Sequence, residues 1–354
     1  MQYITSHPRR VRGEAVHQPI SEKIEEPKKK GGVIAKVNKD GETIGYPPIN
    51  GYYSGEVRKV VEATYLVPEI SHFVQAPEVE HISKRIKLWL DAGYPVHLIG
   101  PTGCGKTSLA MHVATQMGRP VVWINGDETV TTTDLVGGYS QVEAEGLRDK
   151  YIHNVFRSKD ILKADWVDNP LTLACKYGYT LIYNEFARTR PVANNVLLSV
   201  FEEGILELPT KFGEERYVRV HPKFNAILTS NSIEYAGIHR PQDALLDRMV
   251  GIFMDYYSFE TEVDIVREHT DITIDDALKI VGVIRSVREK LPEAQKPGTR
   301  ACIMIAKGLK VMDGEADIEQ LCVDVVATKT SSSSELREKQ RLVKDAISEI
   351  GGRI

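Results

Sequence analysis

Cysteine is scarce in this chain. Its four cysteines, Cys104, Cys175, Cys302 and Cys322, are widely separated and form no CxxC pair. Disulfide frameworks and structural zinc sites need closely spaced, paired cysteines. The spacing argues against both, and we expect reduced thiols in a cytoplasmic protein. The ten histidines show no metal-ligand spacing either, so no zinc or iron site is predicted.

Long hydrophobic runs and an excess of positive charge are also missing. The longest apolar stretches fall far short of the ~20 residues that a membrane-spanning helix needs. The first residues lack the apolar centre of a secretory signal. Forty-five lysines and arginines against 49 acidic residues give a formal net charge of −4. A dedicated nucleic-acid binder would carry a basic surface, so we expect neither a membrane nor nucleic acid as a partner.

What is present is the composition of an ordinary soluble protein, with 354 residues of which 42% are hydrophobic and 27% charged. Residues 1–55 hold few apolar side chains and no sustained pattern. We interpret them as a flexible N-terminal tail, or alternatively as an arm that docks on an acidic surface. The remaining chain predicts an α/β nucleotide-binding domain over 56–257, a helical lid domain over 258–330, and a linker with a C-terminal amphipathic helix over 331–354.

Short apolar segments alternate with helical patterns before residue 257. Helices are expected at 79–90 and 108–117. Strands are expected at 94–99, 120–125, 179–183, 224–229 and 250–254. This alternation predicts a five-stranded parallel sheet flanked by helices. Beyond it the strand signal ends, and a smaller helical unit is expected with helices at 260–269, 273–290 and 298–312.

Residues 100–107 read GPTGCGKT and fit the phosphate-loop pattern G-x-x-x-x-G-K-[ST] at every fixed position. The loop lies between an apolar strand and a helix start, where its amides and the helix dipole favour phosphate. Lys106 would reach the β- and γ-phosphates of ATP, and the Thr107 hydroxyl would ligate Mg²⁺. The expected nucleotide-binding residues are Gly100, Pro101, Thr102, Gly103, Cys104, Gly105, Lys106 and Thr107.

Polar residues follow the predicted strands 179–183 and 224–229. Glu185 is the candidate base that activates the attacking water, and Asn184 before it is the candidate metal-supporting residue. An aspartate is usual at the position of Asn184. A neutral amide can bond a metal-bound water but adds no charge, which leaves hydrolysis less secure than binding. Asn231 ends the following strand, where its amide can hold the lytic water or the γ-phosphate.

Two arginines complete the set of candidates. Arg248 lies near the end of the α/β domain, and Arg300 lies at the start of a helix in the smaller domain. Guanidinium groups suit spread phosphoryl charge because they are planar, always charged and rich in donors. Either arginine can instead belong to a surface salt bridge.

Taken in order, these motifs resemble those of AAA+ ATPases of the MoxR branch: GPTGCGKT, LIYNE, LTSN, LLDR and GTR. A closer resemblance, to the gas vesicle protein N family, rests on FVQAPEVEHISKRIKLWLDAGYPVHLIGPTGCGKTSLAMHVA, DLVGGY and YNEFARTRPVANNVLLSVFEEGILELP. It covers roughly residues 55–305. The long NEFARTRPVANN segment is far more specific than a phosphate loop.

The resemblance implies an AAA+ P-loop ATPase that assists gas vesicle assembly or growth. It implies that Asn184 and Glu185 form the Walker B pair and that Asn231 is the first sensor. It also implies that Arg248 is an arginine finger reaching the neighbouring subunit's nucleotide, and that Arg300 is the second sensor on the helical lid. The implied partners are further copies of the chain in a ring, expected as a hexamer, and gas vesicle shell or accessory proteins.

Two loops fall where this branch carries insertions near the ring pore. They span Asp127–Tyr139 and Pro209–His221. The larger apolar residues on these otherwise polar loops are Leu135, Tyr139, Phe212 and Tyr217. These side chains either contact a client protein or pack beneath their own loops, and the sequence leaves both readings open.

Other functions are compatible with the same motifs. A nucleotide-switched scaffold with negligible turnover would also need the phosphate loop, and Asn184 is its main support. A MoxR-type chaperone for a different client is a further alternative, against which the NEFARTRPVANN segment argues. ATP turnover, measured with and without vesicle proteins, would separate these alternatives.

Overall fold

The computed structural model describes residues 35–37, 43–45, 73–139, 143–146, 160–163, 166–208, 216–231, 239–312, 317–328, 330 and 332–351. The chain divides into two compact units, Met1–Tyr52 and Tyr53–Ile354. In the first unit β1 (Ala35–Val37) pairs antiparallel with β2 (Thr43–Gly45). These two strands were not expected, and the rest of the predicted tail lies outside the described residues.

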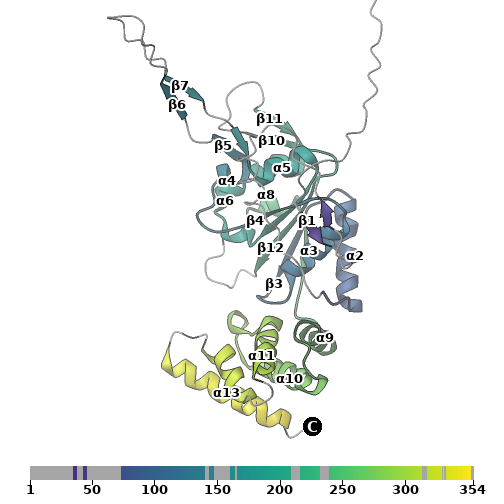
Figure 1. The fold of residues 1–354 in the computed structure, drawn as a ribbon, viewed down its shortest axis with the longest axis vertical. Coiled ribbons are helices and arrows are strands. Elements are labelled where there is room, and N and C mark those ends of the chain that lie inside the picture. Colours follow the sequence, from purple (N-terminus) through teal and green to yellow (C-terminus); the bar gives the residue numbers. More distant parts are fainter. Residues whose placement is uncertain are drawn as a thin grey trace, which may run out of the picture. The chain divides into compact units, whose positions relative to one another are not determined.

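A five-stranded parallel sheet forms the centre of the second unit (Figure 1). Its order is β13-β3-β12-β9-β4, and every neighbouring pair is parallel. The strands are β3 (Val96–Gly100), β4 (Val121–Asn125), β9 (Thr180–Asn184), β12 (Asn225–Asn231) and β13 (Val250–Phe253). The predicted fold class is confirmed, and each strand overlaps the segment in which it was expected.

Helices cover both faces of the sheet. On one face lie α2 (Pro77–Asp91) and α3 (Lys106–Gln116), and on the other lie α5 (Pro170–Tyr177) and α7 (Val196–Glu202). Successive side chains of a strand point to opposite faces. Ile182 therefore joins the α2–α3 core, whereas Leu181 and Tyr183 join the α5–α7 core. Burial on both faces explains why the strands are apolar runs instead of alternating patterns.

Shorter elements connect these layers. They are α4 (Thr132–Val136), β5 (Gly137–Tyr139), β6 (Glu143–Gly146), β7 (Asp160–Lys163), β8 (Trp166–Asp168), η1 (Phe186–Arg188), α6 (Pro191–Asn194), β10 (Ile205–Glu207), β11 (Tyr217–Arg219) and α8 (Asp243–Leu246). Antiparallel pairs join β5 to β8, β6 to β7 and β10 to β11.

The apolar loop residues differ in burial. Leu135 is buried in the α5–α7 core, whereas Tyr217 is exposed on β11. Tyr139 is partly exposed and packs edge-on against Trp166, with ring centroids 5.3 Å apart. Phe212 lies outside the described residues.

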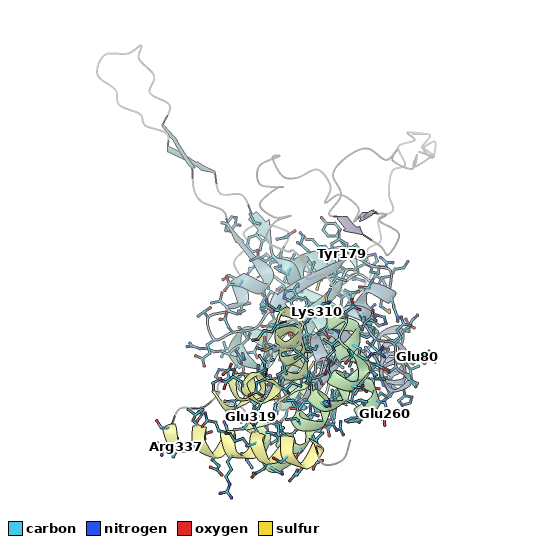
Figure 2. The ribbon with its side chains drawn as sticks, turned by 60° about the horizontal axis from the view of Figure 1, so that its bottom comes forward. Glu80, Tyr179, Glu260, Lys310, Glu319 and Arg337 are labelled. Carbon is cyan, nitrogen blue, oxygen red and sulfur yellow. The ribbon has the colours of Figure 1, made fainter. Side chains whose placement is uncertain are left out.

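The helical region after β13 has its own core. It contains α9 (Phe259–Thr270), α10 (Ile274–Lys290), η2 (Glu293–Gln295), α11 (Thr299–Val311), α12 (Ile318–Cys322), the π-helical turn η3 (Val323–Ala327) and α13 (Ser333–Gly351). Figure 2 turns these helices forward, with Glu260, Lys310 and Arg337 labelled on the exposed surfaces of α9, α11 and α13. None of the helices in the described ranges is long and apolar enough to cross a membrane.

The start of α13 differs from the expectation. A linker was predicted at the start of 331–354, but α13 already begins at Ser333. The hydroxyl of Ser332 accepts a hydrogen bond from the Glu335 amide at 3.2 Å. Serine side chains commonly stabilise helix starts in this way, so part of the serine tract begins a helix. Val343 and Ala346 of α13 are buried in the same core as the other lid helices.

Candidate nucleotide-binding site

The phosphate loop joins the end of β3 to the start of α3. Gly103 and Gly105 have φ values of 80° and 93°, a region that glycine enters without steric cost. Gly100 is required because a β-carbon there would collide with the Met254 carbonyl oxygen. No side chain caps the start of α3 at Gly105. The first amides of this helix are therefore available to an anion such as phosphate.

Lys106 is held over the loop by oxygen atoms. Its side chain is buried, with 6% of the residue exposed, and burial lowers the pKa of its ammonium group. The Nζ atom donates to the carbonyls of Gly100 at 2.9 Å and Pro101 at 2.7 Å. It also donates to Oδ1 of Asn231 at 3.0 Å. An ammonium has three donors, and these acceptors match them, so the cation has a defined place at the loop.

Asn184 is the centre of an amide and hydroxyl network. Its Oδ1 atom accepts from the hydroxyls of Thr107 at 2.8 Å and Thr229 at 2.9 Å. Its Nδ2 atom donates to Oδ1 of Asn125 at 3.1 Å. These three bonds orient the amide oxygen toward Thr107. The Thr107 proton is thereby directed to Asn184, and the hydroxyl lone pairs remain available to a cation.

Glu185 stands in a turn of unusual backbone conformation. Its φ of 54° lies in the left-handed region, which costs about 1 kcal/mol or more for a residue with a β-carbon. A β-carbon on Gly126 would collide with the Glu185 carbonyl oxygen, so glycine is required beside this turn. The carboxylate accepts from Nδ2 of Asn231 at 2.9 and 3.1 Å. It also pairs with Nε of Arg188 at 3.3 Å.

Asn231 therefore connects two predicted site residues. Its amide oxygen accepts from Lys106 and its amide nitrogen donates to Glu185. The sheet brings them together, because Asn231 lies beside Gly100 and Asn184 lies beside Asn125 in the strand registers. The carboxyl ends of parallel strands share one edge of a sheet, which is where ligands of such folds bind.

The two predicted arginines lie in different surroundings. Arg248 donates through Nε to Glu202 of α7 at 2.7 Å and pairs with it through Nη2 as well. Its Nη1 atom donates to the Ala244 carbonyl of α8. Arg300, by contrast, lies at the phosphate loop. A β-carbon built on Gly103 would be 3.6 Å from Cβ of Arg300, and the positive charge of Arg300 contributes to the lowered pKa of Lys106.

Several residues of the site were not predicted from the sequence. They are Asn125, Gly126, Arg188 and Thr229. Asn125 and Thr229 do carry a signal, since each is a polar residue at the end of an apolar strand. Arg188 carries none, because its contact with Glu185 depends on the turn that η1 makes after β9.

The donor set at Thr107 fits a hard cation. Thr107 and Asn184 offer neutral oxygens, which suit Mg²⁺ but supply no negative charge. In the described part of the chain, no three His, Cys, Asp or Glu residues are placed to hold a metal ion. A cation at Thr107 would therefore depend on phosphate oxygens for charge balance.

Comparisons with known proteins identify the family of the chain. Residues 95–249 match the family model described as AAA domain (dynein-related subfamily). Gas vesicle ATPase GvpN of Haloferax mediterranei is 56% identical over 81% of this chain and 83% of its own length. Gas vesicle ATPase GvpN1 of Halobacterium salinarum is 55% identical over 80% of this chain and 82% of its own. Gas vesicle ATPase GvpN of Ancylobacter aquaticus is 42% identical over 74% of this chain and 75% of its own length. With this identity over most of its length, the chain belongs to the gas vesicle ATPase GvpN family of AAA+ proteins.

Proposed function

We propose that this protein binds ATP with Mg²⁺, hydrolyses it in a ring of identical subunits, and uses the cycle to assist gas vesicle assembly or growth. The observation that carries the proposal is the hydrogen-bonded chain from Lys106 through Asn231 to Glu185. Lys106 is the cation expected to contact the phosphates, and Glu185 is the carboxylate expected to activate the attacking water. Asn231 is hydrogen-bonded to both. The protein's similarity to the gas vesicle ATPases of Haloferax mediterranei and Ancylobacter aquaticus supports the link to gas vesicles.

In this proposal Glu185 acts as the general base. A carboxylate oxygen of Glu185 accepts a proton from water as the water oxygen attacks the γ-phosphorus. The bond from the γ-phosphorus to its bridging oxygen breaks, and the electron pair stays on ADP. Lys106 stabilises the charge that develops on the phosphoryl oxygens, and Asn231 keeps Glu185 in place. Thr107, with Asn184 behind it, would hold Mg²⁺, whose charge draws electron density from the phosphates.

Asn184 is the one observation that favours a second candidate, a nucleotide-switched scaffold with negligible turnover. A neutral amide adds no charge beside the cation. Its oxygen nevertheless accepts the Thr107 proton at 2.8 Å, which is the orienting contact that an aspartate would make. This geometry supports hydrolysis over the scaffold alternative.

Arg248 is proposed to act on the nucleotide of a neighbouring subunit. The side chains of Arg248 and Glu202 are 26% and 57% exposed, and ion pairs at such sites contribute only about 0–1 kcal/mol. To reach a phosphate, Arg248 would exchange its contacts with Glu202 and the Ala244 carbonyl for charge-assisted hydrogen bonds to phosphoryl oxygens. A finger that acts in trans implies a head-to-tail contact, which closes rings. Light scattering with ATP and Mg²⁺ should show an oligomer, expected as a hexamer. If the protein is only monomeric at concentrations well above micromolar, the ring is contradicted.

The decisive experiment is phosphate release by the purified protein, with and without gas vesicle shell and accessory proteins. We expect turnover in the wild type and loss of turnover, with retained ATP binding, in Glu185→Gln. Tight ATP binding without turnover under every condition would favour the scaffold. Turnover that vesicle proteins leave unchanged would contradict the assembly role but not the ATPase.

A further inference from the structure

A buried cluster of charged side chains lies inside the helical lid. At its centre is Glu262 of α9, which is completely buried. Oε1 accepts from Arg288 Nη2 at 2.8 Å and from the Thr299 hydroxyl at 2.6 Å. Oε2 accepts from Nη1 of Arg285 at 2.8 Å and Nη1 of Arg288 at 3.1 Å. We refer to Glu262, Arg285, Arg288 and Thr299 as the Glu262 cluster; it joins α9, α10 and α11.

The cluster also fixes two backbone segments next to the lid helices. Arg285 Nη1 donates to the Tyr257 carbonyl at 2.9 Å, in the segment between β13 and α9. Arg288 Nε donates to the Pro297 carbonyl at 2.9 Å, in the segment before α11. The guanidinium carbon of Arg288 lies 3.8 Å from the ring centroid of Tyr256. One carboxylate thus organises both connections.

Both of these segments touch the phosphate loop. The Tyr257 ring is 3.5 Å from a β-carbon built on Gly105. A β-carbon on Gly298 would be 2.6 Å from the Thr102 carbonyl oxygen and 2.9 Å from Cα of Gly103. Only a residue without a side chain fits there. The phosphate loop is therefore in contact with backbone whose position depends on the Glu262 cluster.

Thr299 places the cluster next to Arg300. It is the first residue of α11, is buried, and gives its hydroxyl proton to Glu262. Arg300 follows it, is exposed, and begins its side chain beside Gly103. A bond that holds the first residue of a helix also holds the backbone of the second.

We propose that the Glu262 cluster is a positioning device that sets Arg300 at the phosphate loop and so controls how strongly the site prefers ATP over ADP. The inference rests on the proposed function and on one addition to it, that Arg300 contacts the bound nucleotide as the second sensor. A buried carboxylate between two guanidiniums is stable only when its partners are all in place. The first turn of α11 therefore has one favoured position, and small displacements of a phosphate-binding group are costly to recognition.

Thr299→Val is the test variant, because valine keeps the shape and removes only the hydroxyl. Thr270→Val is the matched control. Thr270 is equally buried in the lid, and its hydroxyl donates to the Val266 carbonyl at 2.6 Å, away from the cluster. Thr299→Ser retains the hydroxyl. The readouts are the dissociation constants of full-length protein for ADP and a non-hydrolysable ATP analogue, with Tm measured separately.

We expect Thr299→Val to reduce the preference for the ATP analogue over ADP by at least about fivefold, the lower range of coupling between sites. Thr299→Ser should keep the preference of the wild type. Thr270→Val should lower Tm without changing the preference. If Thr299→Val and Thr270→Val change the preference for the ATP analogue over ADP equally, the cluster contributes only to the stability of the lid. That result would overturn the inference.

A double-mutant cycle with Arg300→Ala separates this inference from the proposed function. If Thr299 acts through Arg300, Thr299→Val should cause no further loss of preference in the Arg300→Ala background. If the two effects multiply independently, the positioning role is wrong, although Arg300 still contacts nucleotide. If Arg300→Ala alone leaves the preference unchanged, both the role proposed for Arg300 and the inference fail.

Discussion

Replacing Asn231 tests the centre of the proposed site. The side chain is 5% exposed and uses both ends of its amide, one on Lys106 and one on Glu185. Asn231→Ala leaves one donor of the buried Lys106 ammonium without its acceptor, which costs about 1–3 kcal/mol. The Glu185 carboxylate is 29% exposed, so water can replace the Asn231 amide as its hydrogen-bond donor. The net loss of stability at Glu185 should therefore be about 0.5–1 kcal/mol. The free energy of unfolding should fall by about 1.5–4 kcal/mol in total.

The effect on chemistry should differ from the effect on binding. Lys106 keeps the carbonyls of Gly100 and Pro101 in Asn231→Ala, so ATP affinity should fall by less than about tenfold, or 1.4 kcal/mol. Glu185 loses the group that holds it, so turnover at saturating ATP should fall by about 10²-fold, at the lower end of general-base effects. Urea unfolding, nucleotide titration and phosphate release measure the three quantities separately.

Asn231→Asp serves as the matched comparison. Aspartate retains an acceptor for Lys106 but puts a second carboxylate against Glu185 in place of the amide donor. Repulsion between the two carboxylates opposes any recovery of stability, and turnover should stay low. If Asn231→Ala turns over saturating ATP at the wild-type rate, Asn231 does not hold Glu185 in its catalytic position, and the prediction is refuted.

Three further predictions concern other residues. Lys106→Ala removes the ammonium expected on the β- and γ-phosphates, so ATP affinity should fall at least about tenfold, ~1.4 kcal/mol; unchanged affinity in a titration would mean that the site is misplaced. Glu185→Gln and Arg248→Ala should each be inactive alone, yet mixed rings should partly recover turnover, because some sites then pair an intact Glu185 with an intact neighbouring Arg248; mixed rings that form but stay inactive would exclude the trans role. Burial lowers the pKa of His97 from 6.5 to about 4, so the folded state resists its protonation. The unfolded state binds the extra proton first as pH falls below about 6.5, and stability should drop by about 3 kcal/mol by pH 4. Urea unfolding of His97→Gln should lack this part of the pH dependence.

Much of the site was predictable because its signals are local. The residue types of GPTGCGKT bind phosphate through their own backbone and neighbouring side chains, whatever the rest of the chain does. Apolar runs that end in Asn184 or Asn231 identify strands buried on both faces. Parallel pairing then brings the ends of such strands to one edge, so Lys106 and Asn231 could be expected to meet.

Contacts that depend on packing between distant segments could not be read from the sequence. The sequence left Leu135 and Tyr217 with the same two readings, and only tertiary burial separates them. A serine tract is compatible with a linker or a helix start, and the burial of Val343 and Ala346 favours the helix.

The Glu262 cluster shows most clearly what only the tertiary structure decided. Glu262, Arg288 and Thr299 are separated in the chain and are ordinary surface residue types in composition. Only the packing of α9 against α10 and α11 removes water from them, and that loss of water makes their pairing specific. The sequence by itself thus determined the phosphate loop, the strand ends and the fold class, whose physical causes are local. The long-range placement of Asn125 and the Glu262 cluster required the folded chain, as did the turn that brings Arg188 back to Glu185.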